Sequence, residues 1–201
     1  MAPPLCPACG YHCGEEQALC PDCRADLRWL PGRVEAVAGV PVWAPLSYAG
    51  SAPGLVRALK YRGALPLADA MAAHIAAGLP ATLAIGATLV PVPMHQRRRR
   101  RRGYNQAERL AAALGRRTGV PVMDCLERVG SARPQVGRTR EDRLRSLSEV
   151  RVRRLMAVPG RVLLVDDVVT TGATLAACAR PLRAAGVRTL VAVVFARTPG
   201  K

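Results

Sequence analysis

Two adjacent acids stand between an aliphatic run and a hydroxyl-rich turn in residues 162–174. Asp166 and Asp167 follow residues 162–165, whose continuous apolar character is typical of a strand buried on both faces of a parallel sheet. Open α/β sheets bind their ligands at the carboxyl ends of such strands. We therefore expect the two carboxylates to lie in a ligand site, where they would contact uncharged groups such as the vicinal hydroxyls of a ribose.

The turn after the acids has the composition of a phosphate-binding loop. It consists of Thr170, Thr171, Gly172, Ala173 and Thr174, and a helical apolar pattern begins at residue 175. Gly172 allows a positive φ angle and the close approach of a ligand to the backbone. Hydroxyl and free N–H groups at the N-terminus of a helix bind phosphate. A surface turn with helix-capping acids is the alternative, but capping explains one Asp or Thr and not the ordered set.

The amino-terminal cysteines have the spacing of metal ligands. They form two Cys-x-x-Cys pairs, Cys6 with Cys9 and Cys20 with Cys23. This spacing brings four thiolates around Zn²⁺, whereas the alternative, a pair of disulfides, is disfavoured in a reducing cytosol. His12 or Cys13 could replace one ligand. Because so short a segment cannot bury a core of its own, we expect a structural metal in a module over residues 1–32.

The composition is that of a globular protein with an anionic partner. Half of the 201 residues are apolar, and we expect residues 33–201 to form the main domain. The net charge is +16, and residues 97–102 are six consecutive arginines. Such a balance predicts pyrophosphate, nucleic acid or both as partners, although at least half of the arginine run is expected to be a solvated face. Aromatic residues make up 3% of the chain, which argues against base-stacking platforms.

No segment has the pattern of a secretory signal or a membrane span. The first residues lack a basic segment followed by an apolar one. Residues 70–96 contain no Asp, Glu, Lys or Arg, but Gly and Pro interrupt them, so they predict a helix, a turn and a buried strand. We expect a cytoplasmic protein without membrane insertion.

The remaining elements follow from periodicity and turn residues. We expect helices at 54–60 and 67–77, a strand at 87–92, a helix from 107 that ends by 119, and a strand at 189–195. Residues 97–102 are expected to be a basic loop between strand and helix, a second anion-binding arrangement. Residues 40–48 favour a strand, which their prolines should keep at a sheet edge.

These motifs, in this order, resemble the type I phosphoribosyltransferases and, among them, the ComF family of competence-associated proteins. Besides the acid pair and the threonine loop, the resemblance rests on Leu-Lys-Tyr-Arg-Gly (59–63), Val-Pro-Val-Pro-Met-His (90–95), Arg-Gly-Tyr-Asn-Gln (102–106) and the four cysteines. It covers nearly the whole chain. It implies an α/β fold with a parallel sheet and helices on both faces, preceded by a small N-terminal zinc ribbon.

The resemblance also implies a site for phosphoribosyl pyrophosphate (PRPP). Asp166 and Asp167 would be the catalytic pair on the ribose hydroxyls, and residues 170–174 would hold the 5′-phosphate. Lys60, Arg102 and Asn105 would bind pyrophosphate. Mg²⁺ would be held mainly by oxygens of the substrate and by water, as suits a hard ion.

Gln135 matches the family in the region of a hood on the acceptor side. After Arg143 the sequence departs from the family pattern, so the acceptor cannot be named. The resemblance implies an enzyme that transfers a phosphoribosyl group to this unknown acceptor and is linked to DNA uptake or natural competence. The alternative is a non-catalytic accessory protein that keeps the fold, binds single-stranded DNA and works with DNA-uptake proteins. The zinc ribbon, the excess arginine and the divergent hood favour this alternative.

Overall fold

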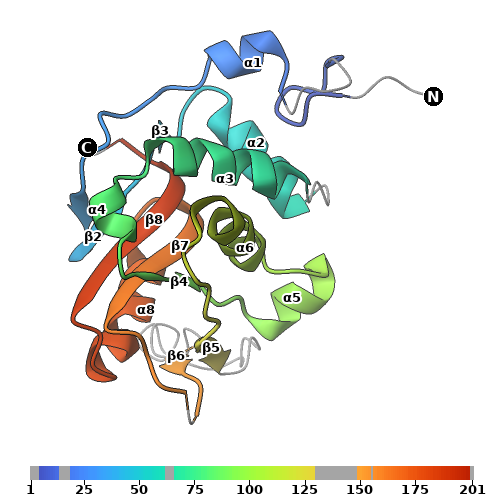
Figure 1. Ribbon diagram of the computed structural model, residues 1–201. Helices are drawn as coiled ribbons and strands as arrows, with labels where there is room; N and C mark the ends of the chain where they lie inside the picture. Colours follow the sequence, from blue (N-terminus) through green and yellow to red (C-terminus); the bar gives the residue numbers. More distant parts are fainter. Residues whose placement is uncertain (1–4, 14–18, 62–65, 130–148, 155, 200–201) are drawn as a thin grey trace.

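The computed structural model describes residues 5–13, 19–61, 66–129, 149–154 and 156–199, and a mostly parallel sheet runs through its centre (Figure 1). The strands are β1 (Glu35–Val37), β2 (Val40–Trp43), β3 (Leu46–Ser47), β4 (Thr88–Pro91), β5 (Leu126–Val129), β6 (Glu149–Val152), β7 (Arg161–Val169) and β8 (Thr189–Arg197). The helices are α1 (Pro21–Ala25), α2 (Ala52–Tyr61), α3 (Pro66–Gly78), α4 (Ala81–Ala84), α5 (Gln96–Arg102), α6 (Gln106–Thr118) and α8 (Ala173–Ala184). The main sheet has the order β1-β2-β8-β7-β4, with β3 also paired to β8. Its pairs are parallel except β1 with β2, and β5 and β6 form a separate antiparallel pair.

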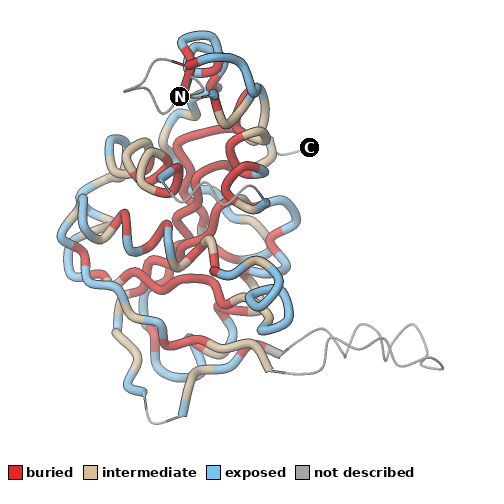
Figure 2. The backbone as a smooth tube through the Cα atoms, turned by 90° about the vertical axis from the view of Figure 1, so that its right-hand side faces the viewer, coloured by how far each residue is buried: buried red, intermediate tan, exposed pale blue. Residues whose placement is uncertain are grey.

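Helices cover both faces of the sheet because its strands are apolar on both sides. Along β7, Leu163 and Val165 belong to the buried cluster that contains residues of α2, α3 and α6. Val162 and Leu164 belong to a second cluster, which contains residues of α8, β5 and β6. Figure 2 shows buried residues through the centre of the molecule. The predicted α/β fold, with a mostly parallel sheet and helices on both faces, is confirmed.

The cysteine-bearing segment packs against the same face as α2. Cys6 and Cys20 share one buried cluster with Leu55 and Leu59 of α2. The Ser51 hydroxyl, just before α2, donates a hydrogen bond of 2.9 Å to a carboxylate oxygen of Asp26. The amino-terminal segment therefore buries apolar surface of the main sheet domain as well as its own.

The arginine run is a helix, so the prediction of a basic loop was wrong. The His95 side chain accepts a hydrogen bond from the N–H of Arg97 and caps the start of α5, and Gly103, with φ of 83°, ends it. Arginine has a high helix propensity. Capping at both ends and this propensity outweigh the repulsion between neighbouring guanidinium groups, each of which can extend into solvent.

The prediction that residues 40–48 form an edge strand was also wrong. The hairpin partner β1 is the edge strand, and β2 lies between β1 and β8. Parallel pairing of β2 with β8 begins at Val42, after Pro41. A proline at the first positions of a strand is tolerated there because its missing N–H donor is not needed by the neighbour.

None of the helices in the described ranges has both the length and the apolar character that a membrane crossing requires.

Candidate functional site

The acid pair lies within β7, near its carboxyl end, and not after the strand as predicted. Strand β7 continues to Val169, and its pairing with β8 includes Asp166 and Val169. Successive side chains of a strand point to opposite faces of a sheet. The two carboxylates therefore lie on different faces, Asp167 on the α2 side and Asp166 on the α8 side.

Asp167 forms a nearly buried ion pair with Lys60. The Lys60 Nζ atom, in the last turn of α2, lies 2.9 Å from Asp167 Oδ2, and the side chain of Asp167 is 2% exposed. The other carboxylate oxygen, Oδ1, accepts a hydrogen bond of 2.9 Å from the N–H of Val168. Two residues that the sequence assigns to different parts of a ligand thus contact each other. A ligand that takes the ammonium group or the carboxylate must replace this pair.

Asp166 is buried with less compensation. Its Oδ1 atom accepts a hydrogen bond of 2.8 Å from the N–H of Asp167. Burial, and next the neighbouring carboxylate of Asp167, raise the pKa of Asp166 well above its ordinary value, against the effects of that hydrogen bond and of Lys60. A carboxyl group in this position favours its neutral form, which can donate a hydrogen bond to an oxygen acceptor.

The raised pKa of Asp166 makes a testable prediction about stability. Above about pH 4 the Asp166 carboxyl group loses its proton in the unfolded chain but keeps it in the folded protein. The free energy of unfolding therefore falls as the pH rises towards the folded-state pKa. Asp166→Asn should therefore raise the melting temperature at pH 8, and the gain should disappear near pH 4. Thermal unfolding at both pH values measures this.

Asp69→Asn is the matched control for this prediction. Hydrogen bonds from Arg117, and also from Arg116, lower the pKa of Asp69. Its contribution to stability is thus present above about pH 4 and is lost as the pH falls through the lowered pKa, so its replacement should lower the melting temperature at pH 8. An Asp166→Asn gain that is equal at both pH values would contradict an origin in ionisation.

The threonine turn has the geometry of a helix N-terminus with a positive-φ glycine. Gly172 is the N-cap of α8 with φ of 75°, and because it has no side chain it forms no side-chain cap hydrogen bond itself. The Thr171 hydroxyl accepts a hydrogen bond of 3.4 Å from the N–H of Ala173. Residues 171, 173 and 174 are exposed, so hydroxyl and N–H groups of this turn are accessible to an anion.

Gly172 is also needed for packing. A methyl group at this position would come within 2.8 Å of Val37 Cγ1 and 2.9 Å of Ala38 Cβ in the β1–β2 turn. Gly172→Ala should therefore lower the free energy of unfolding by about 3 kcal/mol, since it adds a clash to the strain of a positive φ angle. Gly119→Ala is the control, because Gly119 has φ of 73° and nothing within 4 Å. It should lose only about 1 kcal/mol in urea unfolding, and equal losses would show that the clash is relieved.

The second predicted anion-binding arrangement joins β4, α5 and α6. Asn105 is buried and caps α6, where its side-chain oxygen accepts from the N–H of Ala107 and its amide donates to the carbonyl of Val92 at 3.0 Å. Its hydrogen bonds thus hold α6 to the chain just after β4. The Arg102 guanidinium hydrogen-bonds to Gln106 and lies 5.2 Å from the centre of the Tyr61 ring.

Most of the predicted ligand residues line one cavity of about 420 Å³. Those in its lining are Lys60, Arg102, Asn105, Asp166, Asp167, Thr170 and Thr174. Thr171, Gly172 and Ala173 lie outside the lining but belong to the same turn. Gln135 falls outside the described residues. We call this space the aspartate cavity.

The sequence reasoning missed several residues of the aspartate cavity. Arg98, His95 and Tyr61 are among its lining residues. Arg98 lies one helical turn before Arg102, so both side chains project from the same side of α5. If the run is interpreted as a helix, its period places Arg98 on the same side as Arg102, and Arg98 then becomes a candidate for the site.

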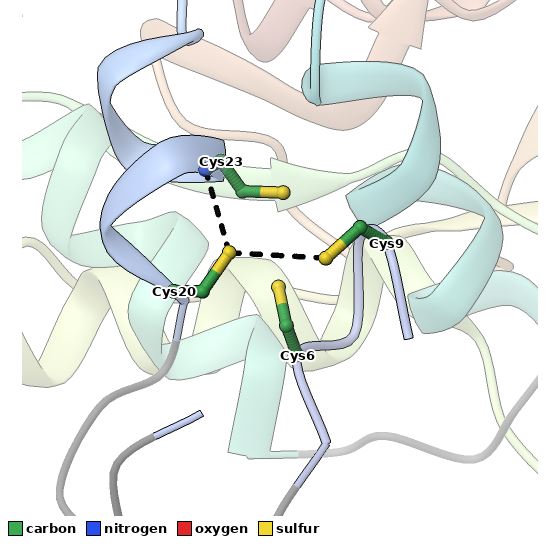
Figure 3. Close-up of side chains that lie close together, drawn as sticks. All are labelled: Cys6, Cys9, Cys20 and Cys23. Atoms are coloured by element: carbon green, nitrogen blue, oxygen red, sulfur yellow. Dashed lines mark hydrogen bonds between the residues drawn. The ribbon is translucent and has the colours of Figure 1, made fainter. Parts of the chain in front are cut away.

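The four predicted metal ligands come together in space (Figure 3). The sulfur atoms of Cys6, Cys9, Cys20 and Cys23 all lie within 4.8 Å of one another. Cys9 Sγ and Cys20 Sγ are 3.8 Å apart. A tetrahedron of Zn–S bonds of about 2.3 Å has edges of nearly this length, so the cluster could bind a metal such as zinc.

The chemistry of the donor set supports this fit. None of the seven cysteines, all of them described, forms a disulfide, and the cluster includes neither His12 nor Cys13. Burial raises the pKa of Cys23 to about 12, whereas that of Cys6 is lowered to about 6, since hydrogen bonds from backbone N–H groups outweigh its burial. Metal binding needs thiolates, so a bound cation must displace protons from this cluster and bind less tightly in acid.

The structure thus defines a class: an α/β protein with a doubly covered, mostly parallel sheet, an acid pair near the end of a central strand, and an N-terminal four-cysteine cluster. Comparison with known proteins identifies the family. The chain is 31% identical over 205 residues to the DNA utilization protein YhgH of Salmonella typhi, which covers 96% of this chain and 84% of the relative. It is 38% identical over 103 residues to Competence protein F of Haemophilus influenzae, covering 49% of this chain and 45% of the relative. The chain belongs to the ComF family.

Further similarities are more distant. Competence protein ComFC of Bacillus subtilis is 35% identical over 94 residues, 47% of this chain and 37% of that protein. Glutamine PRPP amidotransferase from B. subtilis, solved with ADP and GMP, has a TM-score of 0.41 and 20% identity, over 63% of this chain and 26% of that one. Orotate phosphoribosyltransferase from Aeropyrum pernix has a TM-score of 0.36 and 22% identity, over 85% and 75%. No protein-family model matches the chain.

Proposed function

We propose that this protein binds PRPP with Mg²⁺ in the aspartate cavity and transfers its phosphoribosyl group to an acceptor, as part of DNA uptake. The observation that carries the proposal is the convergence of an acid pair, a lysine, three arginines and a hydroxyl-rich helix N-terminus on one cavity of about 420 Å³. Cationic groups and a helix N-terminus match the phosphates, and carboxyl groups match the hydroxyls between them. The names of the relatives, Competence protein F and DNA utilization protein YhgH, support the link to DNA.

The proposed chemistry follows from the charges that line the cavity. Loss of pyrophosphate from C1′ of the ribose develops positive charge on the sugar and negative charge on the leaving group. Asp166 and Asp167 would orient the ribose through its hydroxyls, and Lys60, Arg98 and Arg102 would neutralise pyrophosphate. Mg²⁺, held mainly by oxygens of the substrate and by water, would add its charge on the same side.

Binding of PRPP should break the ion pair between Lys60 and Asp167. When pyrophosphate takes the ammonium group, Asp167 loses its partner at 2.9 Å and can accept hydrogen bonds from ribose hydroxyls instead. A ligand that carries both groups satisfies both residues at once. Ribose 5-phosphate alone, or pyrophosphate alone, would leave one of the two charges without a partner.

Calorimetric titration of the full chain with PRPP and Mg²⁺ tests the proposal. We expect binding in the micromolar range, with ribose 5-phosphate and pyrophosphate each at least about tenfold weaker because one buried charge stays uncompensated. Release of pyrophosphate would then be the readout for a screen of acceptors. Absence of binding by folded, metal-loaded protein would contradict the proposal.

A second function, binding of single-stranded DNA, is favoured by the outer side of α5. Arg97 and Arg101 are exposed, and the Tyr61 ring nearby is 68% exposed beside Arg102. Guanidinium groups bind backbone phosphates, and an exposed ring can stack on a base. Binding to oligo-dT should weaken with salt by a log–log slope of about −0.7 for each phosphate contacted. It should persist when Asp166 and Asp167 are replaced, and a loss there would place both ligands in one site.

A further inference from the structure

A second, larger cavity lies beside the aspartate cavity. It has a volume of about 540 Å³, within the range of small-molecule sites, and we call it the arginine cavity. Residues of α5, the start of α6 and β5 contribute to its lining, as does Arg153 directly after β6. The two cavities share Pro93, Met94 and Arg128. Ligands in the two cavities would therefore be close neighbours across that shared lining.

Helix α5 divides its arginines between the two cavities. Arg98 and Arg102, one helical turn apart, line the aspartate cavity, whereas Arg99 and Arg100 line the arginine cavity. At 100° per residue these two pairs project from different sides of the helix. Arg97 lines neither cavity. One short helix thus supplies cations to two separate spaces.

The arginine cavity has an excess of positive charge because its acids already have partners. Glu108 pairs with Arg99, Asp124 pairs with Arg153 at 2.8 Å, and Glu127 pairs with Arg151 at 2.8 Å. Arg100 takes part in none of the ion pairs between described residues. The cavity can therefore neutralise an added anion.

The rest of the lining is mixed. Pro93, Met94 and Leu126 form its apolar part, and Gln96 adds a polar side chain. Sites for small organic ligands combine apolar side chains with charged groups that fix the orientation of the ligand. An arginine is suited to a carboxylate, which it can bind through two parallel hydrogen bonds. The lining therefore matches a small organic molecule with a carboxylate, whose apolar part would contact Pro93, Met94 and Leu126.

We propose that the arginine cavity binds the acceptor and that the acceptor is a small organic anion of this kind. The role of the ligand as acceptor rests on the proposed phosphoribosyl transfer, but the preference of the arginine cavity for an anion does not. In the transfer, a lone pair of the acceptor forms the bond to C1′ as the C1′–O bond breaks. The electron pair of that bond leaves with pyrophosphate, and the proton of the acceptor passes to solvent.

Three single substitutions on one helix test the site. Benzoate and benzamide, which share a shape and differ in charge, are titrated into the full chain by saturation-transfer NMR. We expect benzoate to bind at least about tenfold more tightly than benzamide, and Arg100→Gln to weaken benzoate binding about tenfold, since one charged hydrogen-bond donor is lost. Arg97→Gln, the matched control, should leave benzoate binding unchanged. Arg98→Gln should weaken pyrophosphate binding about tenfold and leave benzoate binding unchanged.

The outcomes separate this proposal from the proposed function. Equal binding of benzoate and benzamide, or full benzoate binding by Arg100→Gln, would overturn the anion site. Loss of benzoate binding in saturating PRPP and Mg²⁺ would overturn the acceptor role, which needs both cavities filled together. If PRPP fails to bind while benzoate depends on Arg100, the proposed transfer is wrong and the anion site stands.

Discussion

The double variant Asp166→Asn/Asp167→Asn should lose at least about 100-fold in affinity for PRPP. Each carboxyl group is expected to hold ribose hydroxyls, and the loss of a buried hydrogen-bond partner costs about 1–3 kcal/mol. Two such losses correspond to about two to four powers of ten in the dissociation constant. Calorimetric titration with PRPP and Mg²⁺, beside the wild type, measures the change.

A loss of PRPP binding by the double variant must be distinguished from a loss of folding. Asp166→Asn should itself stabilise the protein at neutral pH, whereas Asp167→Asn leaves Lys60 without its partner at 2.9 Å. Thermal unfolding of the double variant therefore accompanies the titration. Asp69→Asn, on α3 and outside the cavity lining, is the matched control and should bind PRPP like the wild type. Unchanged PRPP affinity in a folded double variant would remove the aspartates from the site.

Removal of the metal that the four cysteines are predicted to bind should destabilise the protein by several kcal/mol, a fall in melting temperature of about 10 °C. The cysteine segment is too short to fold through burial alone, but it covers Leu55 and Leu59 of α2, which are buried in the same cluster. Its unfolding would expose apolar surface of the sheet domain. The measurement is thermal unfolding and zinc content before and after treatment with a chelator.

Matched cysteine variants locate the effect. Cys20→Ser removes a member of the cluster whose sulfur atoms lie within 4.8 Å of one another, and it should lose most of the bound zinc. Cys13→Ser changes a cysteine of the same segment outside that cluster and should keep one zinc ion per chain. Zinc loss by Cys13→Ser with retention by Cys20→Ser would show that Cys13 is the fourth ligand.

Function and stability oppose each other at Asp166. Burial raises its pKa, so at neutral pH the fold loses stability relative to the unfolded chain, in which this carboxyl group ionises more readily. An Asn of the same shape would avoid this loss. The carboxyl group is therefore best explained by its use in the site, as is common where a buried titratable group lines a cavity.

Local patterns in the sequence identified several of the elements and the four-cysteine cluster. The helical apolar period after residue 174 identified the buried face of α8, which consists of Leu175, Cys178, Ala179 and Leu182. The Cys-x-x-Cys spacing identified the four-cysteine cluster, and Gly172 identified a turn with positive φ. These signals depend on residues a few positions apart, so the chain expresses them without reference to the rest of the fold.

Only the tertiary structure decided how these parts meet. The alternation of side chains in β7 places Asp167 towards α2, where packing of the helix on the sheet brings Lys60 within 2.9 Å. The tertiary structure also places α5 between the two cavities, with Arg98 in the lining of one and Arg100 in the lining of the other. Such contacts join residues far apart in the chain or depend on how a helix is docked. Periodicity and spacing report the conformation of a segment, whereas the packing of the whole core sets its neighbours.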